Sequence, residues 1–212
     1  MSLSRVPEAT VQRLPVYLRC LLQASAMHMP VISSLQIADM AGTNAAQVRK
    51  DLSYLGELGT RGIGYDVDSL IGHLSRNLGL TEQRRVAIVG YGRLGSALQS
   101  YPGFEKRGMR VVAVLDADPG KVGAAVGGLV VESVDELEDV VTRRGVEIAI
   151  VTVPVRSAQG VVDRLVASGV RAIMNFAPVQ LQVPKGVQVR QADVAGELQI
   201  LSFHLGSATR GD

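Results

Sequence analysis

The chain has 212 residues, of which 47% are hydrophobic and 20% are charged, a composition that is typical of folded globular proteins and excludes a disordered chain. The single cysteine, Cys20, excludes an intrachain disulfide and a zinc site with several cysteines, and with three scattered histidines we expect no metal site. The net charge of +2 neither predicts nor excludes a nucleic-acid partner. Since neither a leader sequence nor a long apolar run occurs, we expect a cytoplasmic protein without a membrane span.

Residues 1–80 are predicted to form a small helical domain. Apolar residues at helical spacing predict a first helix from Pro7 to about Ala26. Pro15 lies inside this run, where we expect a kink or a break. Ser33 and Ser34 are good N-cap residues and predict a second helix over residues 35–41.

A third helix and a β wing are expected to follow. Gly42 ends the second helix, and Asn44 with Gln47 resembles a capping box at the start of a helix that extends to about residue 55. The glycine-punctuated residues 59–67 predict a short hairpin or wing. A last helix of this domain follows, capped by Asp66 or Asp68.

The second and third helices together have the dimensions of a helix-turn-helix motif. Val48, Leu52 and Leu55 fall on one face of the third helix, which leaves polar side chains on the opposite face to reach bases and phosphates. The candidate DNA-binding residues are Gln47, Arg49, Lys50, Ser53 and Tyr54, with Arg61 in the wing. The alternative is an ordinary helical bundle with a solvated polar face.

Apolar, β-rich segments alternate with helical segments from Arg85 onward, and this alternation predicts a parallel sheet with helical crossovers. Residues 179–191 resemble a strand-turn-strand, and the following segment resembles an amphipathic helix. The predicted fold class is α/β. It comprises a winged helix-turn-helix domain over residues 1–80, a doubly wound Rossmann domain over 85–193 and a C-terminal helix over 194–206.

Residues 90–95 match the GxGxxG fingerprint of dinucleotide-binding turns, after an apolar run and before a helical segment. Gly90 permits the tight turn, Gly92 lets backbone N–H groups approach a pyrophosphate, and Gly95 lets the helix pack close to the strand. Asp116 follows Gly95 by 21 residues, at about the spacing of the acid that binds the adenosine ribose. The candidate cofactor-binding residues here are Gly90, Tyr91, Gly92, Arg93, Leu94, Gly95 and Asp116.

The adenosine and nicotinamide ends of the expected cofactor require different chemistry. Asp116 favours NAD(H) over NADP(H), because its charge repels a 2′-phosphate and no Arg or Lys follows within two residues. At the nicotinamide end an apolar pocket is expected, which would prefer the neutral, reduced ring. The residues of its two loops are Val153 and Pro154, and Asn175, Phe176, Ala177 and Pro178. The alternatives are ordinary strand-end loops, and a Rossmann-like sheet that binds another nucleotide or none.

A catalytic acid or base is not evident in the second domain, whose only histidine is His204 near the C-terminus. We therefore predict no catalytic residue and a cofactor-binding protein that is not an enzyme. The competing function is a small NAD-dependent oxidoreductase, with Asn175 or Tyr101 as weak polar candidates. A third is a DNA-binding repressor that senses a different nucleotide.

Residues 47–65 (QVRKDLSYLGELGTRGIGY) resemble the Rex family of redox-sensing transcriptional repressors. So do residues 89–97 (VGYGRLGSA), 101–104 (YPGF) and 175–178 (NFAP), in the same order. The resemblance covers nearly the whole chain, about Arg5 to Leu205, and the first string is far more specific than the glycine fingerprint. It implies a homodimer with winged-helix and NAD(H)-binding Rossmann domains and a C-terminal helix swapped onto the partner. Such a protein binds palindromic operator DNA and releases it when NADH binds.

The same resemblance implies roles for single residues. Gln47, Arg49, Lys50 and Ser53 would lie at the major groove, with Arg61 in the wing. Arg13, Tyr101 and Asp193 match positions that couple the N-terminal helix, the cofactor pocket and the swapped helix. Val194 would approach the cofactor bound to the partner, and Leu198, Leu201 and Phe203 would help the swapped helix dock.

Overall fold

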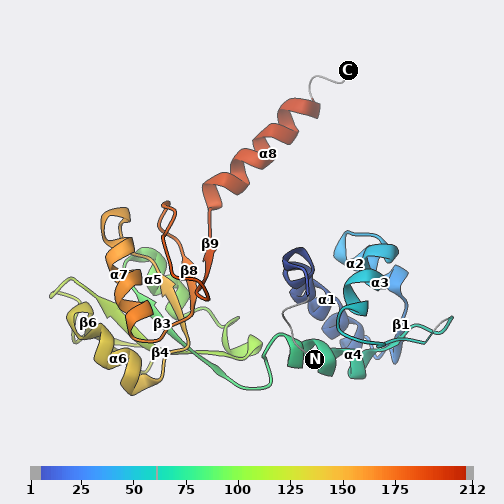
Figure 1. Ribbon diagram of the computed structural model, residues 1–212, viewed down its shortest axis with the longest axis horizontal. Coiled ribbons are helices and arrows are strands. Elements are labelled where there is room, and N and C mark those ends of the chain that lie inside the picture. Colours follow the sequence, from blue (N-terminus) through green and yellow to red (C-terminus); the bar gives the residue numbers. More distant parts are fainter. Residues whose placement is uncertain (1–5, 61, 209–212) are drawn as a thin grey trace. The chain divides into compact units, whose positions relative to one another are not determined.

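A computed structural model describes residues 6–60 and 62–208, and the chain divides into two compact units, Met1–Glu82 and Gln83–Asp212 (Figure 1). The first unit is mainly helical, and the second is built on a parallel sheet. Within these described ranges, none of the helices combines the length and the apolar character that a membrane span requires.

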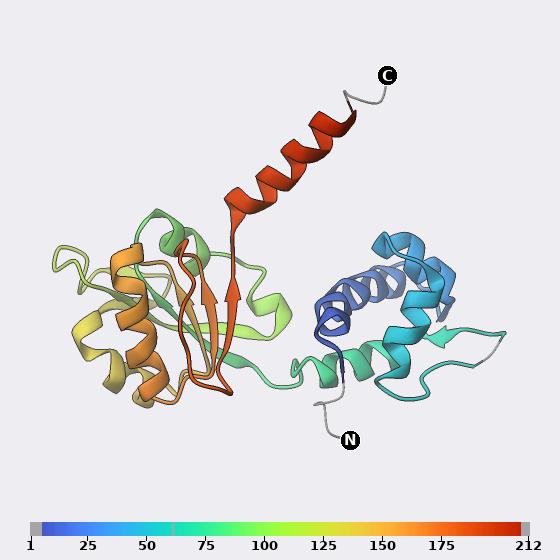
Figure 2. The ribbon, with the colours of Figure 1, turned by 45° about the horizontal axis from the view of Figure 1, so that its top comes forward.

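The first unit packs its helices around one apolar core (Figure 2). The elements are α1 (Glu8–Ala26), β1 (Val31–Ile32), α2 (Ser34–Ala41), α3 (Ala45–Ser53), β2 (Tyr65–Asp66) and α4 (Val67–Asn77). The largest core side chains are fully buried and come from every helix: Tyr17, Leu21, Ile37, Val48, Leu52, Leu70 and Leu74. Helices as short as α2 and α3 are marginal alone, so this shared core stabilises them.

Of the kink or break expected at Pro15, the break does not occur, because helix α1 runs through this residue. A proline inside a helix removes one backbone hydrogen bond and costs about 3 kcal/mol. Here Leu14, Tyr17, Leu18 and Leu21 are buried on either side of the proline, and their burial offsets that cost.

The helix starts of the first unit follow the predicted caps, with one difference. Ser33 and Gln36 form a complete capping box at α2, and the Asp66 carboxylate accepts the Ser69 N–H at α4. At α3 the Asn44 side chain accepts the Gln47 N–H, but the Gln47 side chain donates to Asp51 instead of returning to Asn44. The predicted capping box at Asn44 is therefore only half formed.

The wing is smaller than the predicted hairpin. Thr60 and Gly64 form an isolated antiparallel bridge, while β2 pairs with β1, which lies before α2. A Cβ atom on Gly64 would lie 2.6 Å from the Ile32 carbonyl oxygen, so this close approach requires glycine. Arg61 lies outside the described residues.

The second unit has the strand order β5-β6-β4-β3-β7-β8-β9. The strands are β3 (Arg84–Val89), β4 (Met109–Asp116), β5 (Ala125–Val126), β6 (Leu129–Ser133), β7 (Ile148–Val151), β8 (Ala172–Asn175) and β9 (Gln188–Gln191). All neighbours pair in parallel except β5 with β6. This order, with β3 next to both β4 and β7, is that of a doubly wound nucleotide-binding sheet, as predicted.

The two faces of this sheet are covered differently. Helices α6 (Leu137–Arg144) and α7 (Val155–Ala167) pack on one face, over buried side chains such as Val89, Leu115 and Val151. The other face carries α5 (Arg93–Gln99) and a smaller cluster around Val86 and Ile88. The short 3-10 helices Glu105–Arg107 and Val134–Glu136 complete the connections.

The connection from β8 to β9 holds no helix, and the predicted strand-turn-strand over residues 179–191 is only half right. Residues 188–191 form β9, whereas residues 179–183 form a loop. The Gln159 side chain accepts the Gln182 N–H and donates to the Gln182 carbonyl, and Asn175 donates to the Val179 carbonyl. Side chains thus satisfy backbone groups that a strand partner would otherwise satisfy.

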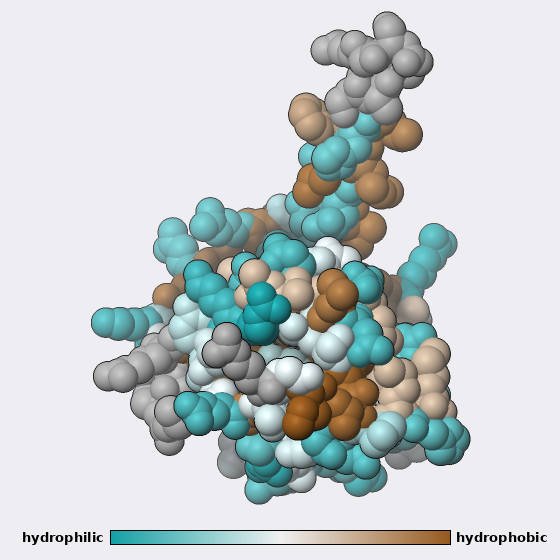
Figure 3. Space-filling model, turned by 90° about the vertical axis from the view of Figure 1, so that its right-hand side faces the viewer, coloured by the Kyte–Doolittle hydropathy of each residue, from teal (hydrophilic) through white to brown (hydrophobic). Residues whose placement is uncertain are grey.

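Helix α8 (Val194–Ala208) follows β9 and extends beyond the sheet (Figures 1 and 2). Its large apolar side chains are exposed, and the space-filling view shows them along the helix beside hydrophilic ones (Figure 3). They are Val194, Leu198, Ile200, Leu201, Phe203 and Leu205. So many exposed apolar side chains on one helix indicate an interaction surface.

The end of α1 generates a prediction about stability. His28 has φ of +58°, while the His28 and Met29 N–H groups bond to the Ser25 and Ala24 carbonyls, as in a Schellman motif. Because a left-handed conformation costs a residue with a Cβ about 1 kcal/mol, His28→Gly should raise the free energy of unfolding by up to that amount in urea titrations. His28→Ala keeps the Cβ and is the control; an equal gain in both variants would contradict this explanation.

Candidate functional site

The glycine turn after β3 brings three backbone segments together. The Gly90 N–H donates to the Leu115 carbonyl at 2.8 Å, and the Thr152 hydroxyl donates to the Gly90 carbonyl at 2.7 Å. Gly90 has φ of +102°, and a Cβ atom there would lie 2.7 Å from the Thr152 carbonyl oxygen. A Cβ atom on Gly95 would overlap the Gly90 carbonyl oxygen. Both glycines are therefore required by packing alone.

Gly92 has a different environment, because a Cβ atom there would meet nothing within 4 Å. It is the N-cap residue of α5, and no side chain caps that helix. The first N–H groups of α5 are therefore left for another partner, and a phosphate group fits such a position.

Asp116 lies at the end of β4 beside this turn and is mostly buried. Its carboxylate accepts the Tyr91 N–H at 2.5 Å and the Asp118 N–H at 2.8 Å, and both oxygens lie 3.3 Å from the Lys121 ammonium. Burial raises the pKa of this carboxyl, but the N–H donors and Lys121 outweigh burial and lower the pKa below its usual value. Asp116 is thus a charged acceptor, as a ribose ligand requires.

Lys121 is a site residue that the sequence analysis missed. A lysine or arginine near Asp116 was sought only within the next two residues. The turn at Asp118 and Gly120 folds the chain back and brings Lys121 to the carboxylate. The Lys121 ammonium also lies 3.8 Å from Asp118. With two carboxylates beside one lysine, the local charge remains negative, and the expected preference for NAD(H) stays a prediction.

A cavity of about 840 Å³ lies at the carboxyl ends of β3, β4 and β7. It brings together Gly90, Gly92 and Asp116 with the apolar residues Val153 and Pro154. The remaining lining residues come mainly from α7 and from the turns that follow β4 and β7, and include Thr152, Arg156, Ser157 and Arg164. Ligands of doubly wound sheets bind at this position, where the strand order reverses.

The loop after β8 does not line this cavity, and the Asn175 amide is used inside the protein. Asn175 is fully buried; its nitrogen donates to the Ala177 and Val179 carbonyls and to the Gln191 side chain, and its oxygen accepts the Ala177 N–H. Asn175 therefore shapes the loop that carries Phe176, Ala177 and Pro178. A direct contact of these four residues with a cofactor stays a prediction.

Two further candidates for the cofactor site are exposed. The Tyr101 ring packs edge-on against Phe104, with 5.3 Å between ring centroids, and Val194 is the first residue of α8. Neither residue lines the 840 Å³ cavity. Asp193, next to Val194, accepts the Gly196 N–H and so caps α8.

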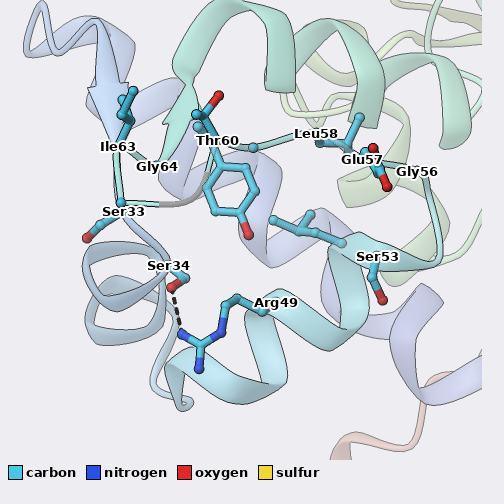
Figure 4. Close-up of a pocket in the computed structure, with 14 residues that line it drawn as sticks. Ser33, Ser34, Arg49, Ser53, Gly56, Glu57, Leu58, Thr60, Ile63 and Gly64 are labelled. Atoms are coloured by element: carbon cyan, nitrogen blue, oxygen red, sulfur yellow. Dashed lines mark hydrogen bonds between the residues drawn. The ribbon is translucent and has the colours of Figure 1, made fainter.

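The candidate DNA-contacting face of α3 is exposed at Arg49, Lys50, Ser53 and Tyr54. A pocket of about 720 Å³ lies between this helix and residues 56–60 and 62–65, which lead into and form the wing (Figure 4). The Arg49 guanidinium donates to the Ser34 hydroxyl at 3.0 Å across its edge, and the Ser53 hydroxyl donates to the Lys50 carbonyl within the helix. Lys50 and Tyr54 are therefore the side chains of this face that extend into solvent.

The opposite side of α3 holds a charged residue that was not predicted. Asp51 is fully buried and accepts hydrogen bonds from Thr10, Arg13 and Tyr17 of α1, and from Gln47 one turn earlier in α3. Arg13 donates through Nε at 2.6 Å and through Nη2 at 2.8 Å, which is the bidentate geometry of a strong pair. In the described structure, Arg13 thus links α1 to α3.

The hydrogen bonds to Asp51 fix its ionisation. Burial raises the pKa of the carboxyl, but the donors Arg13, Tyr17, Thr10 and Gln47 outweigh burial and lower it to about 2. Conversely, burial and the neighbouring carboxylate raise the pKa of the Tyr17 hydroxyl to about 12. The sequence carries one signal of this network. Asp51 is acidic, although the helical spacing set by Val48 and Leu52 predicts an apolar residue at its position in α3.

Comparisons with known proteins match both units. A family model described as a CoA binding domain matches residues 81–179, and one described as a putative DNA-binding protein N-terminus matches residues 5–53. A curated relative from Streptomyces coelicolor, named redox-sensing transcriptional repressor Rex, is 54% identical over 94% of this chain and 77% of its own.

Solved structures of RSP, a Rex-family repressor, have the same architecture. RSP in complex with β-NAD⁺ and operator DNA is 33% identical, covers 97% of this chain and 95% of its own, and has a TM-score of 0.92. RSP in complex with β-NADH is 32% identical, covers 97% of each chain and has a TM-score of 0.88. The predicted combination of an N-terminal DNA-binding domain with a Rossmann-like domain is therefore confirmed.

The buried Asp51 network generates a prediction about acid stability. A carboxyl with a lowered pKa in the folded state stabilises the fold above its unfolded pKa, and that contribution is lost as the pH falls from about 4 towards 2. At pH 7, Asp51→Asn should lower the free energy of unfolding by about 3 kcal/mol, since Arg13 loses its buried partner. In urea titrations followed by circular dichroism, this difference from the wild type should shrink between pH 4 and pH 2.

Asp68→Asn changes an exposed aspartate of the same unit and is the matched control, with an expected effect at pH 7 within about 0.5 kcal/mol. A difference between wild type and Asp51→Asn that stays constant from pH 7 to pH 2 would contradict the stabilising role of the charge.

Proposed function

The chain belongs to the Rex family of redox-sensing transcriptional repressors, and we propose that it binds operator DNA through its first unit and releases it when NADH binds its second unit. The observation that carries this proposal is the union, in one chain, of a helix-turn-helix with an exposed basic face and a glycine-turn cavity with a ribose acid. The RSP complexes with operator DNA and with β-NADH support both halves.

NAD(H) suits the cavity because different residues match different parts of a dinucleotide. Gly92 and the start of α5 would bind the pyrophosphate, and Asp116 would accept hydrogen bonds from the ribose hydroxyls. Val153 and Pro154 would form an apolar wall for the nicotinamide, which favours the neutral reduced ring over the cationic oxidised one. The other predicted contacts are Tyr91, Arg93, Leu94, Gly95, Tyr101, Asn175, Phe176, Ala177, Pro178 and Val194.

DNA would meet the exposed side of α3, with the helix in the major groove. Lys50 and Arg49 provide positive charge for guanine edges or phosphates, and Ser53 and Tyr54 provide hydroxyl groups for the backbone. Arg61 would enter a minor groove beside the wing. These residue roles rest on their exposure and on the family resemblance.

We propose a homodimer on the basis of apolar side chains that the second unit leaves exposed, on α8 and at Met174 of β8. Helix α8 exposes six large apolar side chains, of which Leu205 is 74% exposed. The sheet face that carries Val86 and Ile88 has no helix from the β8–β9 connection, and Met174 of β8 is 38% exposed. Exchange of α8 between two copies would cover apolar surface on both, and would carry Val194 towards the cofactor bound to the partner.

Coupling between the two ligands requires that NADH prefer a state of the dimer that fits the operator poorly. A shift from 1:99 to 99:1 needs a preference of about 10⁴, or about 5.5 kcal/mol, which two bound cofactors can share. The proposed coupling residues are Arg13 in α1, Tyr101 after α5 and Asp193 before α8.

Catalysis has no place in this function. Among the described residues that line the 840 Å³ cavity, no histidine, cysteine or tyrosine is available as a proton donor or acceptor. The curated relative from Streptomyces coelicolor is named as a repressor. The names of the relatives therefore favour repression over the oxidoreductase alternative.

The first test is a fluorescence anisotropy titration on a labelled palindromic duplex at fixed salt, because phosphate contacts make DNA affinity depend on salt. NADH should dissociate the complex, and NAD⁺, NADPH and coenzyme A should do so only at much higher concentrations. A complex that resists NADH, or yields equally to all four ligands, would contradict redox sensing. Failure to bind any duplex would contradict the repressor function.

Two variants should separate the functions of the two units. Lys50→Ala should weaken DNA binding about tenfold and leave the Kd for NADH unchanged. Asp116→Ala should weaken NADH binding at least about tenfold, because a charge-assisted acceptor is lost, and should leave the DNA complex resistant to NADH. The Kd for DNA is measured by fluorescence anisotropy, and the Kd for NADH is measured by NADH fluorescence.

Lys185→Ala removes the same charge from an exposed loop of the second unit and is the control for Lys50. If either site variant weakened DNA and NADH binding equally, the proposed division between the units would be wrong.

A further inference from the structure

Gln47 lies in the first turn of α3, and Asp51 controls the direction in which its amide faces. The Gln47 nitrogen Nε2 donates to Asp51 Oδ1 at 2.9 Å. The same carboxylate accepts hydrogen bonds from Thr10, Arg13 and Tyr17. An ionised carboxylate only accepts, so the amide nitrogen must face Asp51 and the amide oxygen must face away.

The Gln47 oxygen is left without a protein donor. Within residues 6–60 and 62–208, no hydrogen bond to Gln47 Oε1 is formed, and the side chain is half-buried at the edge of the exposed face of α3. In helix-turn-helix proteins, residues of the first turns of the recognition helix contact base edges. A flip of the amide exchanges its donor nitrogen and its acceptor oxygen. A freely rotating amide can therefore present either group to a base, whereas an amide held in one orientation presents each group at a fixed place.

We propose that Asp51 orients Gln47 so that its amide oxygen faces the major groove as an acceptor, and that the one base which Gln47 contacts must therefore carry an exocyclic amino group. This inference rests on the proposed function. Only adenine and cytosine carry such a group in the major groove. Adenine is favoured over cytosine, because its N7 also accepts the second Nε2 hydrogen of Gln47.

Arg13, Tyr17 and Thr10 stabilise this orientation. A protonated Asp51 would carry a donor of its own and would tolerate either face of the amide. The bidentate Arg13 pair and the two hydroxyl donors hold the carboxylate in its ionised, accepting form. Asp51 is thus a positioning residue, which acts on DNA through Gln47.

The test uses a palindromic duplex selected by the wild-type protein from a randomised library, and variants of that duplex at every base pair. At one base pair in each half-site, the wild type should prefer adenine at least about fivefold, and Gln47→Ala should abolish that preference. Asp51→Asn, whose amide accepts and donates, should abolish the same preference and keep those at other positions. Asp68→Asn removes an equal charge from an exposed site and should keep all preferences.

A uniform loss of affinity across all duplexes in Asp51→Asn would assign Asp51 a purely structural role and overturn the inference. So would an intact adenine preference in Asp51→Asn, or a Gln47-dependent preference for a G·C pair over an A·T pair. Circular dichroism establishes whether Asp51→Asn is folded.

A second measurement needs no variant of Asp51. In the selected duplex, the adenine identified by Gln47→Ala is replaced by purine, which lacks the N6 amino group. Wild-type affinity should fall at least about fivefold, and unchanged affinity would overturn the inference. If the wild-type protein selects no duplex, or if NADH does not dissociate it from the duplex, the proposed function is contradicted instead. If selection and release occur but Asp51→Asn leaves the base preference unaltered, only the role of Asp51 is contradicted.

Discussion

The close approach of backbone at Gly90 is the constraint on which the nucleotide site depends. One residue joins β3 to β4 through its N–H and to β7 through its carbonyl, and Gly95 of α5 packs on that same carbonyl. A side chain at either glycine would separate the strands whose carboxyl ends form the cavity. The fingerprint is therefore a requirement of chain packing before it is a requirement of ligand binding.

Two buried carboxylates perform different tasks because their donors differ. Asp51 is surrounded by side-chain donors from α1 and α3, so its charge stabilises the packing of those two helices. Asp116 receives two backbone N–H groups and one partly exposed lysine, and it borders an open cavity. The first arrangement is closed to further ligands, whereas the second leaves acceptor capacity for hydroxyl groups.

Local sequence signals predicted the parallel sheet, the helix caps at Ser33 and Asp66 and the glycine turn, because each depends on residues close together in the chain. The errors arose where distant residues decide. The core on both sides of Pro15 keeps α1 continuous, Lys121 returns to Asp116 through a turn, and Asp51 is satisfied by side chains 34–41 residues away. The internal role of Asn175 was likewise not predictable, because its hydrogen-bond partners lie in its own loop and in β9.

Helix α8 has a consequence for how the stability of the protein depends on its amount. A 15-residue helix with exposed apolar side chains is marginal in water by itself, and the described residues of its own chain leave six of those side chains uncovered. In the proposed homodimer its stabilisation comes from the second subunit, so the law of mass action would apply to folding at this end of the chain. Dilution would loosen α8 without altering a single contact inside either unit, so the structure of this helix would depend on the concentration of the protein in the cell.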